Sequence, residues 1–386
     1  MEEFVRGEGP YLYTATGERY LDLLGGTYNV TFGHSHPRVV AAICRAGTRM
    51  VNCYDRPSRP RRELEERLKT LTGFDQVALL TTGAEAVEKA LMLAIGQQGR
   101  KGSRVHTFEG CYHGRSFATY PMLTYGEFPG GWSPPLNWHE LLFEEPVPLF
   151  DNSIVLTEVI QGHFGTIPPS GLSTFWEKWR VECDRTGSVL IFDEIVTGFG
   201  RTGNDFGFQT AGVRPDILIL GKSLGQGIPI TAVLWDNVKF PKMKYSMSTT
   251  NAGNPFCCEV ALECIKTYIE EGMLRESKRV GDALFTQLEC INAPTWPNGG
   301  YHAYAQGSMI YISCPSNEDA AALEDALLID DDDDHIITRA CGHVLKMLPI
   351  YTTSTAILSN AGKRIREEVE CHAEDESAKQ EAAAGD

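Results

Sequence analysis

The sequence predicts an α/β fold with a mostly parallel central sheet in a large domain and a smaller α+β region. Short apolar runs alternate with helical stretches from residue 76 onward, which is typical of a parallel sheet with helices on both faces. Several of these runs end on a polar or charged residue, and ligands bind at the carboxyl ends of strands in open α/β sheets. Later runs at 309–313 and 336–348 indicate the strands of the smaller region.

Length and composition fit this class. The chain has 386 residues, of which 42% are hydrophobic, enough for a sizeable core and about two or three domains. Its net charge of -16 argues against a nucleic-acid partner. The 11 cysteines form no regular framework, residues 1–10 are too charged for a secretory signal, and no apolar stretch approaches the roughly 20 residues of a membrane helix. We therefore expect a cytoplasmic protein with reduced thiols and no membrane contact.

The individual helices and strands are predicted from the spacing of hydrophobic residues and the length of each apolar run. The run 217–220, for example, is too short for a helix and rich in β-branched residues, so we predict a buried strand. The predicted strands are 76–80, 103–108, 153–157, 188–192, 217–220 and 231–235, after a small hairpin at 11–22. The predicted helices are 38–50, 63–71, 86–95 (with Val87, Ala90, Leu91 and Ala94 facing the core) and 255–271 (with Val260, Leu262, Ile265 and Ile269 facing the core).

Several segments between these elements carry weaker signals. The glycines of segment 25–29 permit close approach of the backbone to a ligand, so Gly26, Thr27 and Tyr28 are candidate substrate residues. The basic segment 55–62 is expected to be a solvated loop before the helix 63–71, with recognition of an anionic substrate as the alternative. His34 and His36 have no carboxylate or cysteine beside them, so we expect a turn and predict no metal. We expect a solvated turn at the acidic run 330–334 and disorder from residue 371 to the end.

Lys222 is the first candidate catalytic residue. It follows the strand 217–220 through Gly221, which places it at the carboxyl edge of the sheet. A desolvated lysine at such an edge can lose its proton and form a Schiff base with an aldehyde. A surface lysine after a turn is the alternative for this residue taken alone.

Thr82, Gly83 and Ala84 connect the first strand of the sheet to the helix 86–95. Small residues at a helix N-terminus leave N–H groups free at the positive end of the helix dipole, which suits a phosphate. An ordinary helix cap by Thr82 is the alternative.

Residues 111–115 follow the next strand. Tyr112 can stack on a planar ring, and Gly114 lets the neighbouring backbone pass close to it. A core aromatic residue is the alternative.

Asp193 comes directly after the apolar run that ends at Phe192. Burying its charge is costly unless a cation faces it, and a protonated pyridine nitrogen is such a cation. A metal ligand is the competing interpretation, but no histidine or carboxylate cluster has a suitable spacing. The GxGxxG match at 198–203 is misleading, because 204–214 shows no helical period and the next strand ends on Lys222 instead of an acidic residue.

Taken in order, the phosphate-binding turn, the stacking aromatic, the edge aspartate and the lysine resemble the class III aminotransferases. These are fold type I enzymes of pyridoxal 5'-phosphate. The resemblance covers nearly the whole chain, through the motifs LDLLGG, GHSHPRVV, TTGAEAVEKAL, GCYHGRS, TEVIQG, LIFDEIVTGFGRTG, PDILILGKSLGQGIPI and TNAGNP. It implies a large domain at 44–245, a small domain formed by 1–43 and 246–370, and a homodimer with shared active sites.

The resemblance also implies a role for each matching residue. Lys222 would form the Schiff base with the cofactor, and Asp193 would pair with its pyridine nitrogen. Thr250 would reach the phosphate bound by the partner subunit. The other implied cofactor contacts are Thr82, Gly83 and Ala84 at the phosphate, Tyr112 stacked on the ring with His113 beside it, Glu158 supporting Asp193, and Ile195 and Val196 near the ring.

Three residues depart from the family pattern and concern the substrate. Val196 replaces a glutamine that bonds the ring hydroxyl, and His163 replaces the glutamate that gates the substrate arginine. Lys346 stands where that arginine is expected, and it offers a carboxylate a point charge instead of a two-pronged donor. We therefore expect an atypical substrate pocket, which suits specialised metabolism.

The predicted reaction is the transfer of an amino group between an amine or amino-acid donor and a carbonyl acceptor. The same cofactor and lysine also serve aminomutases, epimerases, decarboxylases and phospholyases, which remain alternatives. A cofactor-binding protein without turnover is an alternative from another class, but it would not need both Asp193 and Lys222.

Overall fold

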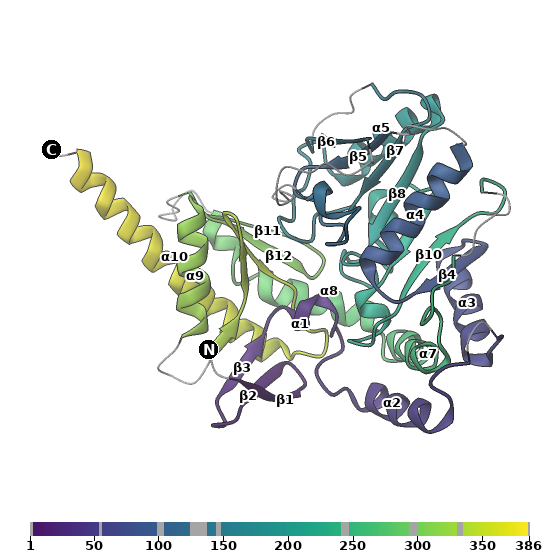
Figure 1. The fold of residues 1–386 in the computed structure, drawn as a ribbon. Coiled ribbons are helices and arrows are strands. Elements are labelled where there is room, and N and C mark those ends of the chain that lie inside the picture. The colour runs from purple at the N-terminus through teal and green to yellow at the C-terminus, as the bar shows by residue number, and fades with distance from the viewer. Residues whose placement is uncertain are drawn as a thin grey trace. The chain divides into compact units, whose positions relative to one another are not determined.

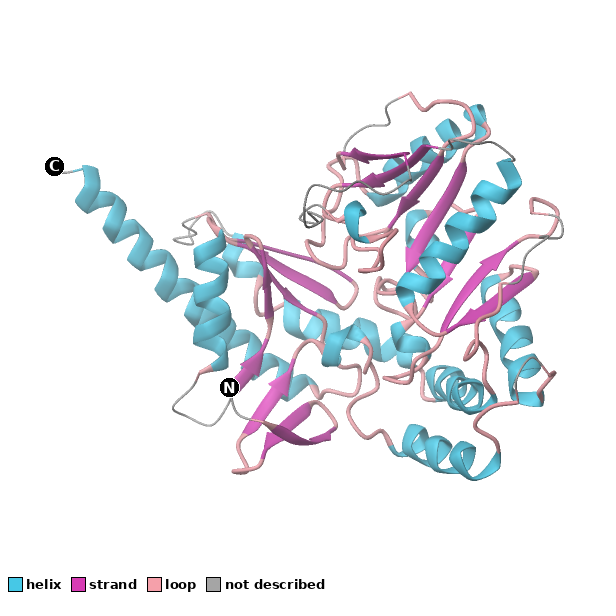
Figure 2. Cartoon of the chain, viewed as in Figure 1, coloured by secondary structure: helices cyan, strands magenta, loops and turns pink. Residues whose placement is uncertain are grey.

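A computed structural model describes residues 3–53, 56–98, 104–123, 137–143, 148–240, 247–292, 300–329 and 335–384. The chain forms two compact units, each assembled from segments that are far apart in the sequence (Figures 1 and 2). The small unit consists of Met1–His36, Gly200–Gly203 and Glu271–Asp386, and the large unit of Pro37–Phe199 and Asn204–Glu270. These units divide the chain at other residues than the predicted domains, whose boundaries stay a prediction.

The large unit is built on a seven-stranded sheet with the order β4-β10-β9-β8-β7-β5-β6. Neighbouring strands from β6 to β9 run parallel, and β10 runs antiparallel to both β9 and β4. The bounds are β4 (Gln76–Leu80), β5 (Arg104–Phe108), β6 (Asn137–Leu141), β7 (Ile154–Thr157), β8 (Val189–Glu194), β9 (Ile217–Leu220) and β10 (Thr231–Trp235). The predicted α/β fold with a mostly parallel sheet is confirmed.

The predicted strands agree closely with this sheet. The largest shift is in β8, which continues to Glu194 and so includes Asp193 as a strand residue. Strand β6 was not predicted, because its sequence Asn137–Leu141 mixes polar and apolar residues and lies at the edge of the sheet. The start of the predicted strand 103–108 lies at residue 103, outside the described residues.

Helices cover the sheet and pack beside it. The large unit contains α2 (Pro37–Arg49), α3 (Arg59–Thr72), α4 (Gly83–Gln98), η1 (Tyr120–Met122), α5 (Leu172–Thr186), α6 (Gly207–Ala211), η3 (Lys222–Leu224) and α7 (Pro255–Glu270). Helix α4 packs against strands β7 to β10, and the four residues predicted to face the core are all buried. In α7 the prediction was wrong for Ile269, which is 47% exposed. The buried stripe runs instead through Ala261, Cys264, Ile265 and Tyr268, which have the i, i+3, i+4, i+7 spacing of one helix face.

The small unit contains two four-stranded sheets, with the orders β1-β2-β3-β13 and β11-β12-β15-β14. Their bounds are β1 (Phe4–Glu8), β2 (Tyr11–Thr14), β3 (Arg19–Asp22), β11 (His302–Gln306), β12 (Met309–Ser313), β13 (His335–Ile337), β14 (Arg339–Cys341) and β15 (Val344–Met347). The helices are α1 (Gly25–Tyr28), α8 (Met273–Phe285), η4 (Glu289–Asn292), α9 (Asn317–Leu328) and α10 (Thr355–Ala384). The predicted hairpin at 11–22 corresponds to β2 and β3, and the acidic run 330–334 lies outside the described residues.

Helix α10 extends through the segment for which the sequence predicted disorder. It runs to Ala384, and glutamate, lysine and alanine in this segment are strong helix formers. Its buried residues recur every three or four positions at Leu358, Ala361, Ile365, Val369 and Ala373. The first half of α10 is therefore anchored by its packing in the small unit.

The GxGxxG match has a structural explanation in the small unit. Arg201 is fully buried, its Nη1 donates to the carbonyl of Pro349 at 2.8 Å, and its own carbonyl accepts from Ser308 N at 2.9 Å. A Cβ on Gly307 would lie 2.5 Å from that carbonyl, so two backbones pass in close contact there. Segment 200–203 therefore packs against the chain at Gly307 in the small unit.

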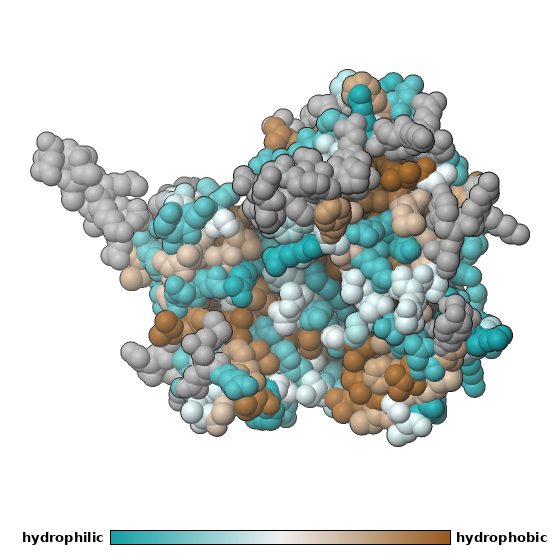
Figure 3. Space-filling model, viewed as in Figure 1, coloured by the Kyte–Doolittle hydropathy of each residue, from teal (hydrophilic) through white to brown (hydrophobic). Residues whose placement is uncertain are grey.

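The surface carries scattered hydrophobic residues. The face seen in Figure 3 is largely hydrophilic or neutral, with a hydrophobic patch where Figure 1 places α2. Val40 on α2 is 43% exposed, and Met50 and Val51 after it are 40% and 61% exposed. Among the described helices, none combines the length and the apolar character that a bilayer span requires.

Candidate active site

Asp193 and Lys222 lie at the ends of adjacent parallel strands. Asp193 in β8 is opposite Ile219 of β9, and Lys222 follows β9 after Gly221. Lys222 has a φ of 41°, a left-handed conformation that is uncommon for a residue with a side chain and is often found at functional sites. The structure thus brings the two main predicted residues to one edge of the sheet.

Asp193 is buried against a histidine. The carboxylate is 2% exposed, its Oδ2 lies 2.9 Å from His113 Nδ1, and its Oδ1 accepts from Ile195 N at 3.1 Å. Burial alone lowers the pKa of His113, but the hydrogen bonds with Asp193 and Cys111 outweigh it and raise the pKa to about 10. His113 is therefore an imidazolium at neutral pH, and its charge faces the side chain of Asp193. The sequence placed both residues at the cofactor without predicting that they contact each other.

Glu158 supports the loop next to this pair. Its Oε2 accepts from Tyr112 N at 2.9 Å and its Oε1 from Gly162 N at 3.1 Å. Burial raises the pKa of Glu158 to about 7, and the nearby charge of Asp193 adds to this, although His113 and the two N–H groups oppose it. Glu158 is the acidic residue that holds Tyr112 in place.

Ile195 packs between the two backbone segments that carry the predicted phosphate site and the lysine. A Cβ on Gly83 would lie 2.9 Å from Ile195 Cδ1, and a Cβ on Gly221 would lie 3.3 Å from Ile195 Cγ1. The same kind of close approach joins Gly114 to α4, because a Cβ there would lie 2.6 Å from Ala84 Cβ. Glycine is required at these positions by packing.

The start of α4 presents the backbone N–H groups of its first turn. Glu85 N donates to Thr82 Oγ1 at 3.3 Å, so Thr82 caps the helix as its alternative role predicted. The N–H groups of Gly83 and Ala84 belong to the first turn, where a helix offers no acceptor of its own. A capped helix start of this kind binds an anion such as a phosphate.

The predicted substrate residues of the large unit lie around Tyr112. Its ring centroid is 4.9 Å from that of His163, with a tilt of 52° between the two planes. Val196 is 7% exposed, and a Cβ on Gly162 would lie 3.0 Å from its Cγ2, so it packs on the turn after Glu158. Thr250 is exposed on the large unit.

The remaining substrate candidates belong to the small unit. Gly26 and Thr27 are exposed, and the ring of Tyr28 lies under Lys346, with 4.8 Å between Nζ and the ring centroid. Asp22, which the sequence did not indicate, organises this loop: it accepts from Leu24 N, Gly26 N and His34 Nε2 at 2.8, 2.7 and 2.8 Å. The signal that would have found it is its place at the end of a strand, shortly before the glycine pair Gly25 and Gly26.

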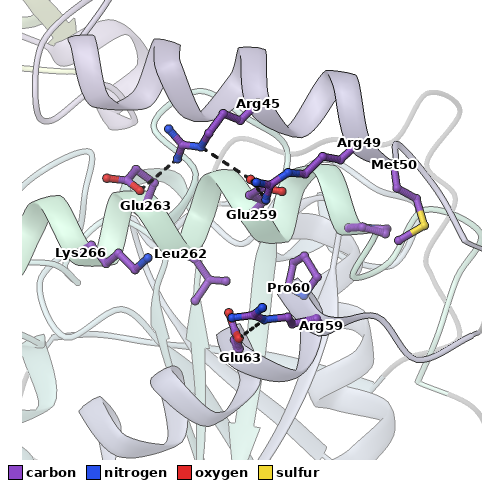
Figure 4. Close-up of a pocket in the computed structure, with 11 residues that line it drawn as sticks. Arg45, Arg49, Met50, Arg59, Pro60, Glu63, Glu259, Leu262, Glu263 and Lys266 are labelled. Carbon is purple, nitrogen blue, oxygen red and sulfur yellow. Dashed lines mark hydrogen bonds and ion pairs between the residues drawn. The ribbon is translucent and has the colours of Figure 1, made fainter.

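A different pocket of about 430 Å³ lies among α2, α3 and α7 and contains none of the predicted site residues (Figure 4). Its arginines pair with its glutamates, at 3.2 Å for Arg45 and Glu263, 3.0 Å for Arg49 and Glu259, and 2.6 Å for Arg59 and Glu63. The basic segment thus contributes Arg59 to a neutralised wall, which is closer to the solvated role than to recognition of an anion.

The residues at the sheet edge fit pyridoxal 5'-phosphate. The free N–H groups at the start of α4 suit its phosphate, and the buried carboxylate of Asp193 suits its protonated ring nitrogen. Nε2 of His113 is buried and has no hydrogen-bond partner among the described residues, so a polar group remains to be satisfied beside Asp193. An ε-amino group is at hand in Lys222 at the end of the neighbouring strand.

Comparison with known proteins gives the same family throughout. The model of the family "Aminotransferase class-III" matches residues 3–124 and 151–369. The chain is 32% identical to an acetylornithine aminotransferase of Mesorhizobium japonicum over 94% of this chain and 92% of that one. It is 33% identical to a succinylornithine transaminase of Yersinia enterocolitica over 82% and 80%.

Solved structures show the same fold. An ornithine aminotransferase from Toxoplasma gondii matches with a TM-score of 0.81 at 23% identity, over 97% of this chain and 91% of that one. An amine transaminase from an uncultivated Pseudomonas species, solved with its cofactor, matches with a TM-score of 0.83 at 23% identity, over 97% and 95%. The chain therefore belongs to the class III aminotransferases, pyridoxal 5'-phosphate enzymes that move an amino group from a small amine to a carbonyl acceptor.

Proposed function

We propose that Lys222 is the catalytic base and the covalent attachment point of the cofactor, and that Asp193 is the partner of its ring nitrogen. The observation that carries this proposal is the placement of both residues at the ends of adjacent strands, with Asp193 buried and held by His113. Pyridoxal phosphate, when bound, supplies an aldehyde that accepts amino groups and a ring that takes up electrons.

The protein's own groups have separate tasks in this proposal. The Nζ atom of Lys222 holds and returns the proton that moves during amino transfer, which requires its neutral form. His113 is a positioning residue, because its imidazolium holds the side chain of Asp193 in place through a contact of 2.9 Å. Gly83 and Ala84 would bind the phosphate through N–H groups, and Thr82 caps that helix. Tyr112 and Ile195 would hold the ring by packing against it.

We further propose that the substrate pocket is atypical and serves specialised metabolism. His163, Val196 and Lys346 stand where an acidic residue, an amide and a guanidinium are expected. His163 removes a fixed negative charge, and Val196 removes a hydrogen-bond donor. A lysine cannot bind a carboxylate through two parallel hydrogen bonds as an arginine can. The chain would then favour other substrates than the acetylornithine and succinylornithine in its relatives' names.

The proposal includes a homodimer in the cytoplasm. Thr250 is exposed, as a residue that reaches the partner's phosphate must be, and the hydrophobic patch near α2 offers a surface for association (Figure 3). A monomeric mass in sedimentation of the loaded protein would contradict the dimer.

Substitution of Lys222 tests the central assignment. We expect Lys222→Ala to lower turnover about 10³-fold or more, because the variant lacks the Nζ atom that would serve as the base. After borohydride treatment of the loaded protein, peptide mass spectrometry should find the cofactor on position 222 in the wild type and on no peptide of the variant. Lys239→Ala is the matched control, because the side chain of Lys239 is half-exposed and its partner Asp216 also pairs with Arg180, so the variant should keep both properties.

Full turnover in Lys222→Ala would refute the assignment. The products decide between the reaction types: exchange of the amino group supports transamination, whereas isomerisation, loss of carbon dioxide or elimination of phosphate would indicate another reaction of the same cofactor.

A further inference from the structure

We propose that Tyr28 is a specificity-determining residue that covers Lys346 and excludes substrates with a carboxylate on the carbon that bears the amino group. The inference rests on the proposed place of Lys346 in the substrate pocket and adds a mechanism of selection. The substrates it implies are amines that carry an apolar group at that position.

The contact itself is between a buried cation and an aromatic face. Lys346 lies in β15, an inner strand of its sheet, and is 0% exposed. Its Nζ atom lies 4.8 Å from the ring centroid of Tyr28, which is 7% exposed. A cation over a desolvated ring is attracted to the negative face of that ring, so the pair is stable without a carboxylate.

The ring is held in this position by its backbone. Tyr28 has a φ of 65°, which is strained for a residue with a side chain, and Gly25 and Gly26 before it also have positive φ values. Asp22, which is 1% exposed, fixes this turn by accepting from Leu24 N, Gly26 N and His34 Nε2. A buried carboxylate with three donors does not rearrange easily, so the aromatic face stays over Lys346.

Selection follows from what a carboxylate would have to displace. To reach Nζ it must move the ring and break the cation–π contact, and it gains only a single point-charge interaction in return. A substrate with a methyl group in place of the carboxylate meets the ring without this cost. The Tyr28 ring therefore converts an anion-binding position into an apolar wall.

The test compares L-alanine with isopropylamine, which differ by a carboxylate in place of a methyl group. We expect the wild type to prefer isopropylamine in kcat/KM, and Tyr28→Ala to shift the ratio toward alanine about tenfold. Tyr28→Phe keeps the aromatic face and should keep the wild-type ratio. Adding Lys346→Met to Tyr28→Ala should abolish the gain for alanine, because the gain requires the ammonium.

A binding measurement makes the result independent of turnover. Calorimetric titration with isobutyrate and with isobutyramide should show that Tyr28→Ala binds isobutyrate about tenfold more tightly than the wild type does, with isobutyramide unchanged. If Tyr28→Ala leaves both the kinetic ratio and isobutyrate binding unchanged, or weakens them for the carboxylate, the inference is wrong. Such a result with the cofactor still attached at Lys222 would leave the proposed function intact.

Discussion

At the scale of single residues, the buried contact between His113 and Asp193 makes the stability of the protein depend on pH. The buried contact of 2.9 Å between His113 and Asp193 stabilises the fold as an ion pair only while His113 carries its proton. The pKa of His113 is raised from its usual 6.5 to about 10, so its contribution is complete below pH 6.5 and is lost as the pH rises toward 10. We expect His113→Gln to lower the free energy of unfolding of the cofactor-free protein by about 3 kcal/mol at pH 7 and by much less at pH 10. Urea unfolding across this range measures the difference.

His106 provides the control for this experiment. It is also a buried histidine of the large unit, but burial lowers its pKa to about 4, with smaller contributions from His139 and Arg104. It is therefore neutral throughout the range, and His106→Gln should change stability by the same amount at every pH. A loss for His113→Gln that is independent of pH would mean that its role is packing alone.

At the scale of elements, the close contact between the loop around Tyr112 and the start of α4 positions the N–H groups that we propose to bind the phosphate. Gly114 has a φ of +106°, and a Cβ there would meet Ala84 Cβ at 2.6 Å and Ala84 Cα at 2.9 Å. We expect Gly114→Ala to push the first turn of α4 away, to cost about 3 kcal/mol of stability and to weaken binding of pyridoxal phosphate at least tenfold. Fluorescence titration with the cofactor measures the affinity.

Substitution of Gly171 tests backbone strain without a steric clash. Its φ of +81° imposes a similar backbone cost on alanine, but no atom lies within 4 Å of the added Cβ. Gly171→Ala should therefore cost only about 1 kcal/mol and leave cofactor affinity unchanged. Equal effects of the two substitutions would show that the helix position does not depend on this contact.

The same scale explains how much the sequence could predict. Strands such as 217–220 and the buried face of α4 were predicted correctly, because short β-branched runs and helical periodicity are local signals. The contact of His113 with Asp193 was not predicted, since 80 residues separate them and only the parallel register of the sheet brings them together. Ile269 was assigned to the wrong face because the stripe of α7 is decided by its neighbours α2 and α3.

At the scale of the whole molecule, α10 shows where the stabilising part of the chain ends. Its buried positions stop at Ala373 among the residues whose exposure is described. We expect Ile365→Ala, at a fully buried position, to cost about 3 kcal/mol. A chain that ends at Glu374 should melt within about 2 °C of the full chain. Calorimetry of both proteins measures this, and a large loss on truncation would assign a structural role to the last turns.

The pairing of β3 with β13 joins Arg19–Asp22 to His335–Ile337 in one sheet. During synthesis, β3 leaves the ribosome long before its neighbour has been translated, whereas every strand of the seven-stranded sheet is complete by Trp235. The edge of β3 that pairs with β13 therefore stays unpaired during most of translation. We expect that edge to be a site where a chaperone binds or where two nascent chains pair incorrectly.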